Sequence, residues 1–160
     1  MACALRVSDA SSMAMHAMAL LALEPGTSLS TRAIASCFGI SEAHLSKVLQ
    51  RLTKVGLVRS VRGPKGGFSL ARNPENITLM EVFTAIEGPV ESSGCVFGVS
   101  RCDGTSCVLG SVMADANRML LDHLARTDLR TVSAVFLDGR IKLPFDPPSR
   151  SAPLEAAGPD

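Results

Sequence analysis

The 160-residue sequence has no Trp or Tyr and only six Phe. Proteins that bind single-stranded nucleic acid stack bases on exposed aromatic rings, so this composition argues against that class. The longest apolar run near the start, Met13 to Leu23, is interrupted by His16 and is about half of the roughly 20 residues that a membrane span needs. No basic segment with a small-residue cleavage site precedes it. We therefore expect no signal peptide, no membrane partner and a cytoplasmic protein.

Acidic residues are scarce in one part of the chain. Between Ser30 and Arg72 the only acid is Glu42, whereas the same stretch holds eight of the 16 Lys and Arg. The net charge of +1 conceals this segregation. A concentrated basic face is typical of a protein that binds the phosphate backbone of nucleic acid, although an ordinary solvated surface can have the same composition.

The five cysteines are odd in number, and without a secretory signal they favour free thiols or metal ligands over a disulfide framework. Cys37 fits a small core residue. The other candidates, Cys95, Cys102 and Cys107, share a short segment rich in Gly and Ser. Three soft thiolates on such a loop suit iron in an iron–sulfur cluster, 2Fe-2S or 4Fe-4S.

Other chemistry remains open for the cysteine segment. A structural zinc site usually has close cysteine pairs and four protein ligands, and this segment offers neither. A thiol redox switch is a further alternative, because Arg101 beside Cys102 favours the thiolate. An enzyme that uses Cys102 as nucleophile lacks an evident histidine partner, and no other catalytic grouping is present, so we expect no enzymatic activity.

Spacing within the basic stretch predicts a helix-turn-helix. Thr31 or Ser30 begins a short helix, Gly39 supplies a left-handed turn, and Ser41 begins a second helix. Small Ala35 lies where the two helices cross, as this motif requires. The apolar residues that lock the pair are Ile34, Phe38, Leu45, Val48, Leu49 and Leu52.

A predicted β-hairpin follows directly. Residues 57–61 and 68–70 have strand character, and residues 62–67 form a Gly-rich turn. A hairpin in this position is a wing, which can lie along the DNA backbone or enter the minor groove with its basic tip. The turn has neither nucleotide-binding spacing and leads into a strand, so it is not a phosphate-binding loop for a nucleotide.

The outward face of the second helix and the wing form the expected contact with a double-stranded DNA operator. Polar groups near the start of the helix can reach base edges, whereas Lys47, Arg51 and Lys54 are placed for phosphates. The predicted DNA-binding residues are Thr31, Ser41, Glu42, Ala43, His44, Ser46, Lys47, Gln50, Arg51, Arg59, Arg62, Gly63, Pro64 and Lys65.

Three longer helices and a short terminal helix at residues 131–136 are expected. Ser8 or Asp9 caps a first helix with one apolar face, in which His16 is a packed residue, and Thr78 caps a helix that ends at Gly88. From Val108 to Ala125 an apolar stripe repeats at helical period, and a helix this long favours pairing with its copy in a homodimer over packing in a monomer. The predicted dimer residues are Leu109, Val112, Met113, Ala116, Met119, Leu120 and Leu124.

The helix-turn-helix, the wing Val61–Phe68, the helix Leu79–Gly88 and the three cysteines after it together resemble the Rrf2 family of bacterial transcription regulators. The resemblance covers roughly residues 5–137. It implies a homodimeric winged-helix repressor or activator whose DNA affinity depends on an iron–sulfur cluster that senses redox state, nitric oxide or iron. It also implies that Cys95, Cys102 and Cys107 are cluster ligands, although some relatives lack the cysteines and bind DNA without sensing.

The same resemblance suggests a fourth ligand. The position where one member has a histidine ligand is Gly110 here, and the cysteines are unevenly spaced where the commoner family pattern is even. Nitric-oxide-sensing members use an aspartate of the first helix, given across the dimer, and Asp9 aligns with it. Asp9 is therefore the candidate metal ligand from the partner subunit, unless it only caps its helix.

The predicted architecture is mainly α with a small β-hairpin wing: a winged helix-turn-helix followed by a long C-terminal dimerisation helix. Residues 1–87 form the DNA-binding domain, and residues 88–107 form the cysteine cluster loop. Residues 108–137 form the dimerisation helix and a short terminal helix. Residues 138–160, which are rich in proline, are expected to be a disordered tail.

Overall fold

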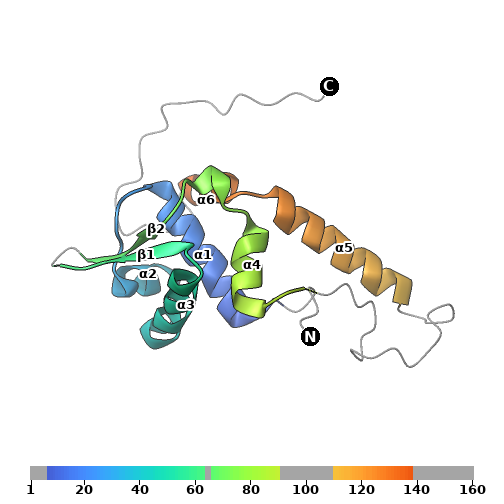
Figure 1. Ribbon diagram of the computed structural model, residues 1–160, viewed down its shortest axis with the longest axis horizontal. Coiled ribbons are helices and arrows are strands. Elements are labelled where there is room, and N and C mark those ends of the chain that lie inside the picture. The colour runs from blue at the N-terminus through green and yellow to red at the C-terminus, as the bar shows by residue number, and fades with distance from the viewer. Residues whose placement is uncertain (1–6, 64–65, 91–109, 139–160) are drawn as a thin grey trace, which may run out of the picture.

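The computed structural model describes residues 7–63, 66–90 and 110–138 (Figure 1). Within them the chain is mainly helical with one two-stranded antiparallel hairpin, as the sequence predicts. None of the described helices is long and apolar enough to cross a membrane. The elements are α1 (Asp9–Leu23), α2 (Thr31–Phe38), α3 (Glu42–Lys54), β1 (Val58–Val61), β2 (Gly67–Leu70), η1 (Pro74–Asn76), α4 (Leu79–Glu87), α5 (Gly110–Arg126), α6 (Leu129–Ser133) and η2 (Ala134–Asp138).

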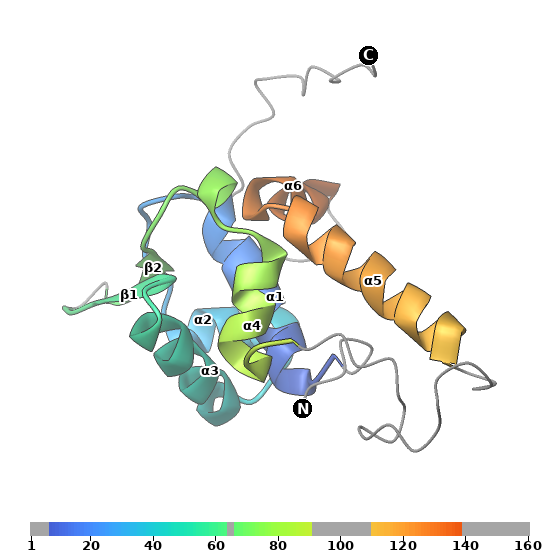
Figure 2. The same ribbon diagram turned by 45° about the vertical axis from the view of Figure 1, so that its right-hand side comes forward.

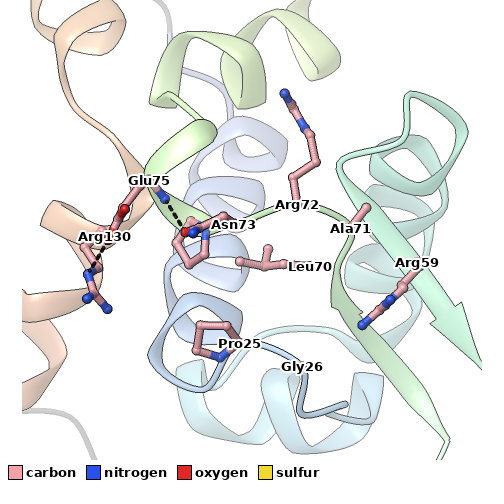
Figure 3. Close-up of a pocket in the computed structure, with 10 residues that line it drawn as sticks. Pro25, Gly26, Arg59, Leu70, Ala71, Arg72, Asn73, Glu75 and Arg130 are labelled. Atoms are coloured by element: carbon pink, nitrogen blue, oxygen red, sulfur yellow. Dashed lines mark hydrogen bonds and ion pairs between the residues drawn. The ribbon is translucent and has the colours of Figure 1, made fainter.

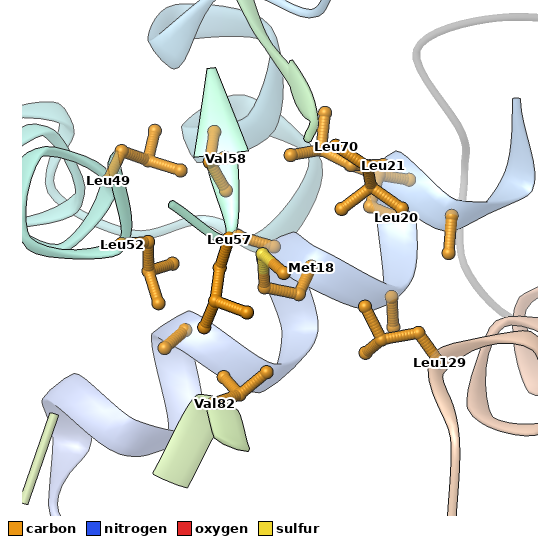
Figure 4. Close-up of a cluster of buried hydrophobic side chains, with 14 of the residues drawn as sticks. Met18, Leu20, Leu21, Leu49, Leu52, Leu57, Val58, Leu70, Val82 and Leu129 are labelled. Atoms are coloured by element: carbon orange, nitrogen blue, oxygen red, sulfur yellow. The ribbon is translucent and has the colours of Figure 1, made fainter. Parts of the chain in front are cut away.

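Helix α1 is the centre of the core. It packs against α3, α4, α6 and β2, and every residue from Ala17 to Leu23 is buried. Figure 4 shows Met18, Leu20 and Leu21 of this helix among side chains from α3, β1, β2, α4 and α6. The expectation of a single apolar face was therefore too narrow, because small alanines let neighbours approach α1 from several sides.

The helix-turn-helix is confirmed in the predicted position. Ser30, not Thr31, caps α2, and its Oγ accepts from Ala33 N at 3.1 Å. Gly39 adopts φ 64°, the left-handed conformation that lets the chain turn sharply into α3. Phe38 at the end of α2 lies 5.9 Å, between ring centroids, from Phe136 of η2. The motif is thus braced from the C-terminal part of the chain.

The hairpin is anchored to the segment before α2. Leu29 and Phe68 exchange both backbone hydrogen bonds, with N–O distances of 3.0 and 2.8 Å. At Gly67 an added Cβ would lie 2.3 Å from the carbonyl oxygen of Leu29, so only glycine permits this approach. The wing and the helix-turn-helix therefore share one support.

The C-terminal helices return to the N-terminal core. The backbone of residues 127–129 pairs with residues 77–79 through Leu79 N to Thr127 O at 2.9 Å and Leu129 N to Ile77 O at 3.0 Å. Leu129 has no exposed surface, and Phe136 is 5% exposed. Helix α6 is consequently part of the same core as α1, whereas the sequence predicted only a short terminal helix at residues 131–136.

Helix α5 leaves this core as an arm. The C-terminal end of α5 lies near α4, and the rest of α5 extends away from the core toward Gly110 (Figures 1 and 2). Leu124 is buried and Leu120 packs against the core, whereas Val112 and Met119 are 61% and 73% exposed. The expected start at Val108, the dimer residue Leu109 and the expected tail from residue 139 lie outside the described residues.

Replacement of Thr78 tests the start of α4. The Thr78 hydroxyl accepts from Glu81 N at 3.2 Å, and the Glu81 carboxylate accepts from Thr78 N at 3.0 Å, which forms a capping box. We expect Thr78→Ala to lower the free energy of unfolding by about 1 kcal/mol, because the orphan N–H of Glu81 loses its acceptor. Thr78→Ser keeps the hydroxyl and should lose less than half as much. Urea titration monitored by circular dichroism measures both, and equal losses would contradict the capping role.

Candidate nucleic-acid interface

The recognition helix α3 is fixed through its apolar side. Leu45, Leu49 and Leu52 have no exposed surface. The Ser41 side chain caps the N-terminus and accepts from His44 N at 3.4 Å. With one side buried against α1 and α4, the opposite side must face solvent in a constant orientation. Figure 1 shows α3 and the hairpin at the end of the molecule away from the α5 arm.

The exposed side of α3 carries the predicted contact residues. Ser46 of α3 and Thr31 of α2 are half-buried, and the rest are exposed: Ser41, Glu42, Ala43, His44, Lys47, Gln50 and Arg51. Polar and basic groups therefore lie on the outward face of a single helix, and the major groove of DNA is wide enough to admit a helix. The structure places these residues on or beside α3, and their contact with DNA stays a prediction.

Arg51 differs from the other cations of α3. One of its terminal nitrogens donates to the backbone carbonyl of Ile86, at the end of α4, at 2.6 Å. The expected phosphate contact of Arg51 therefore has to come from the donors that this bond leaves open, since a guanidinium has five. Sequence spacing gave no sign of this bond, because its two residues are 35 positions apart.

The wing presents Arg62 and Gly63 to solvent at its described edge. Arg59 of β1 is also exposed, and its Nε donates to Ser69 Oγ of the neighbouring strand at 2.9 Å. This bond holds the guanidinium close to the hairpin. Pro64 and Lys65, the remaining predicted wing contacts, lie outside the described residues.

A pocket of about 460 Å³ opens beside the base of the hairpin (Figure 3). Three arginines line it, but each is bonded to a different partner, and Figure 3 shows Arg72 and Arg130 pointing away from one another. The pocket therefore lacks the converging donors that an anion site needs. The partners are Ser69 at 2.9 Å for Arg59, Glu81 at 2.5 Å for Arg72 and Glu75 at 3.2 Å for Arg130.

Of the four predicted metal ligands, the structure describes only Asp9. It is the first residue of α1 and is exposed, and Ser8 is the cap, with its Oγ accepting from Ser11 N at 3.1 Å. Since Asp9 does not serve as the cap, its carboxylate stays open to a ligand. Cys95, Cys102 and Cys107 lie outside the described residues, and within those residues no group of three or more His, Cys, Asp or Glu gathers as a metal site.

Cys37, the cysteine within the described residues, and His16 of α1 both contact neighbouring side chains of the fold. Burial raises the pKa of the Cys37 thiol, which disfavours the reactive thiolate, and Cys37 packs against the core as expected. His16 was expected to be packed but is exposed. Its ring nevertheless meets the edge of Phe38 at 5.5 Å, and its Nδ1 lies 2.7 Å from the Ser12 carbonyl oxygen.

Sequence reasoning missed a hydrogen-bonded cluster at the C-terminal end of α4, where α4 meets the start of α1 and Arg51 of α3. The Oε1 atom of Glu87 accepts from the hydroxyls of both Ser8, at 2.5 Å, and Ser11. Hydrogen bonds from Ser11 and Ser8, and the charge of Arg51, hold the pKa of Glu87 below its usual value despite partial burial. The α1 N-terminus, the α4 C-terminus and α3 therefore meet at one charged point.

Comparison with known proteins agrees with this geometry. The Rrf2 family, described as "Iron-dependent Transcriptional regulator", matches residues 7–134. The chain is 33% identical over 135 residues to the HTH-type transcriptional regulator BadM of Rhodopseudomonas palustris, covering 83% of this chain and 81% of BadM. It is 35% identical over 102 residues to IscR of Aliivibrio salmonicida, a match that covers 63% of this chain and 52% of that IscR.

Solved structures show the same fold. IscR of T. potens superposes with a TM-score of 0.67 at 28% identity, covering 86% of this chain and 92% of that one. CymR, the global cysteine regulator of B. subtilis, superposes with a TM-score of 0.66 at 27% identity, covering 81% and 97%. The winged helix, the outward recognition helix and the extent of the family match lead to one conclusion: the chain belongs to the Rrf2 family of DNA-binding transcription regulators and is not an enzyme.

Proposed function

We propose that the protein is a homodimer that binds a double-stranded DNA operator and that an iron–sulfur cluster held by its cysteine segment controls operator affinity. The observation that carries the DNA-binding part is the exposed polar and basic face of α3, held rigidly beside a wing. Lys47 and Gln50 lie on that face. A major-groove helix needs such a face for bases and phosphates together.

The exposed apolar face of α5 supports the dimer. Val112, Ala116 and Met119 follow one another at helical spacing, and Val112 and Met119 are largely exposed. Leu124 is 4% exposed in the single chain, so it contributes to the subunit's own core and not to the proposed interface. A two-fold pair of such arms gives two recognition helices, which can match half-sites about 34 Å apart on one side of DNA.

The donor set supports the cluster. Cys95, Cys102 and Cys107 supply three thiolates. The carboxylate of Asp9 of the partner subunit, which is exposed and does not cap α1, supplies an oxygen ligand. When bound, the cluster supplies a redox- and nitric-oxide-sensitive link between these four residues. Cysteine thiolates hold it on one subunit, and Asp9 ties the first helix of the other subunit to the same point.

This arrangement couples the site to DNA through α1. Asp9 begins α1, α1 packs against α3, and Met18 of α1 and Leu45 of α3 are both buried in the same core. A constraint on Asp9 therefore acts on the helix that supports the recognition helix. Coupling of this kind requires two states with different operator affinity, and the ligand bond to Asp9 distinguishes them.

A cysteine thiol switch is the second candidate. Arg101 is adjacent to Cys102 in the sequence and favours a thiolate there. In that case oxidation of the cysteines, with no iron present, changes operator affinity. A DNA-binding dimer without sensing is the third candidate, in which neither cluster damage nor thiol oxidation changes operator affinity.

Lys47→Ala tests the DNA face. Loss of one phosphate contact per protomer should weaken binding to all duplex sequences and reduce the slope of log affinity against log salt by about 0.9 for each protomer bound. Fluorescence anisotropy over a range of salt concentrations measures the slope. Arg126→Ala removes another exposed cation, at the end of α5, and should leave the slope unchanged. Equal slopes for wild type and Lys47→Ala would contradict a DNA contact at α3.

Met119→Glu tests the dimer. A charge placed on the exposed apolar face of α5 should convert the dimer to a monomer, because the carboxylate would be buried without a partner. Sedimentation velocity measures the mass. Ala125→Glu places the same charge on an exposed position of the opposite side of α5 and should remain dimeric. A dimeric Met119→Glu protein would place the interface elsewhere.

The triple variant Cys95/Cys102/Cys107→Ala tests the cluster. Anaerobically purified wild type should be coloured and contain iron and sulfide, whereas the triple variant should be colourless and should not change its operator affinity after nitric oxide treatment. Cys37→Ala is the matched control and should keep the colour, because Cys37 packs against the core. A colourless wild type that responds to thiol oxidation favours the thiol switch, and one that takes up zinc instead contradicts the cluster.

A further inference from the structure

The carboxylate of Glu87 connects two helices that the sequence keeps far apart. It lies at the last residue of α4 and accepts hydrogen bonds from Ser8 and Ser11 at the start of α1. Ser11 has no exposed surface. A buried hydroxyl that donates to a carboxylate makes a charge-assisted bond, about twice as strong as a neutral one. The beginning of α1 is thereby fastened to the end of α4.

The recognition helix is fastened to the same place. Arg51 of α3 donates to the carbonyl of Ile86, the residue before Glu87, at 2.6 Å. The C-terminal carbonyls of a helix carry partial negative charge, and the Glu87 carboxylate adds a full charge that attracts Arg51. We call Ser8, Ser11, Arg51, Ile86 and Glu87 the Glu87 node.

We infer that Glu87 is a positioning residue for DNA binding: through the node it fixes where the recognition helix presents Arg51, and it links that position to the start of α1. Arg51 is exposed, so its remaining donors are open to a phosphate. The link to the proposed cluster rests on the proposed function, because Ser8 of the node precedes the candidate ligand Asp9 directly. The positioning of Arg51 does not depend on a cluster.

The positioning role and simple charge repulsion predict opposite effects of removing the Glu87 charge on DNA affinity. Removing a negative charge near DNA should tighten binding by reducing repulsion of phosphates. Removing the Glu87 charge should instead weaken binding, because Arg51 loses the attraction of the carboxylate and keeps only its bond to the Ile86 carbonyl. Glu87→Gln is suited to this comparison, since the amide oxygen can still accept from Ser8 and Ser11.

The experiment is a double-mutant cycle on the full-length dimer. The probe is a duplex selected by the wild-type protein from a random-sequence pool. We expect Glu87→Gln to weaken binding about fivefold, and to change it less than about twofold when Arg51 is already alanine. Glu75→Gln is the matched control, because it removes the same charge from a surface pair with Arg130, and it should bind equally well or more tightly.

A second measurement does not need DNA. The side-chain Nε–H signal of Arg51 in an NMR spectrum reports its order. It should be sharp in the wild type and in Glu75→Gln, and broadened or shifted toward the free-arginine position in Glu87→Gln. Thermal melting verifies that each variant is folded. If Glu87→Gln is unfolded, Ser11→Ala replaces it, with a smaller effect expected in the same direction.

The outcomes are distinct. Unchanged or tighter binding of Glu87→Gln, an equal loss in the Arg51→Ala background, or an unchanged Arg51 signal each overturns the positioning role. If the wild type selects no duplex from the pool, the proposed DNA function fails, and the Arg51 signal alone decides the node. If the cycle holds but the triple cysteine variant binds as wild type does, the node stands and its link to a cluster does not.

Discussion

The burial of α1 on several sides is the constraint on which the rest of the structure depends. Residues 17–23 are enclosed by parts of α3, α4, α6 and β2, so each of these elements is oriented by the same helix. Close packing of this kind has little free volume, and a shift of α1 must be shared by its neighbours. The recognition helix, the wing and the C-terminal helices therefore form one body around α1.

The charged contacts sit at the rim of this body and not within it. Glu87 joins α1 to α4, Arg51 joins α3 to α4, and Arg72 pairs with Glu81 at 2.5 Å near the wing base. Exposed pairs such as Arg72–Glu81 contribute little to stability, commonly under about 1 kcal/mol. The geometry of the charged contacts nevertheless determines how the basic face is arranged, and that face is the proposed contact with DNA.

Short-range signals predicted the parts of the fold that depend on them. Gly39 and Ser41 marked the turn and the start of α3, and Thr78 marked the start of α4, because caps and left-handed turns need particular residues at particular places. The apolar period also predicted α5. The family resemblance named the right family, but it leaves the cofactor, the fourth ligand and the contacting side chains as proposals.

Long-range contacts were beyond the reach of sequence patterns. The bond from Arg51 to Ile86 and the return of Leu129 to the core depend on how distant elements meet, which no local spacing encodes. Helix α6 has only five residues, too few to show a helical period. Burial of α1 on several sides was missed for a related reason: its alanines count as weak apolar signals, although their small size is what admits the neighbours.

Helix α5 has a mechanical consequence. Its C-terminal end is fixed through Leu124 and the paired backbone at residues 127–129, while its 17 residues extend about 25 Å from that support. A rigid rod held at one end is a lever. A tilt of about 10° at the fixed end moves the other end by about 4 Å, and the reverse holds for a force applied at Gly110. Gly110 follows Cys107 by three residues, so the chemistry proposed for the cysteines would act at the long end of this lever, where a small force has the greatest leverage on the core.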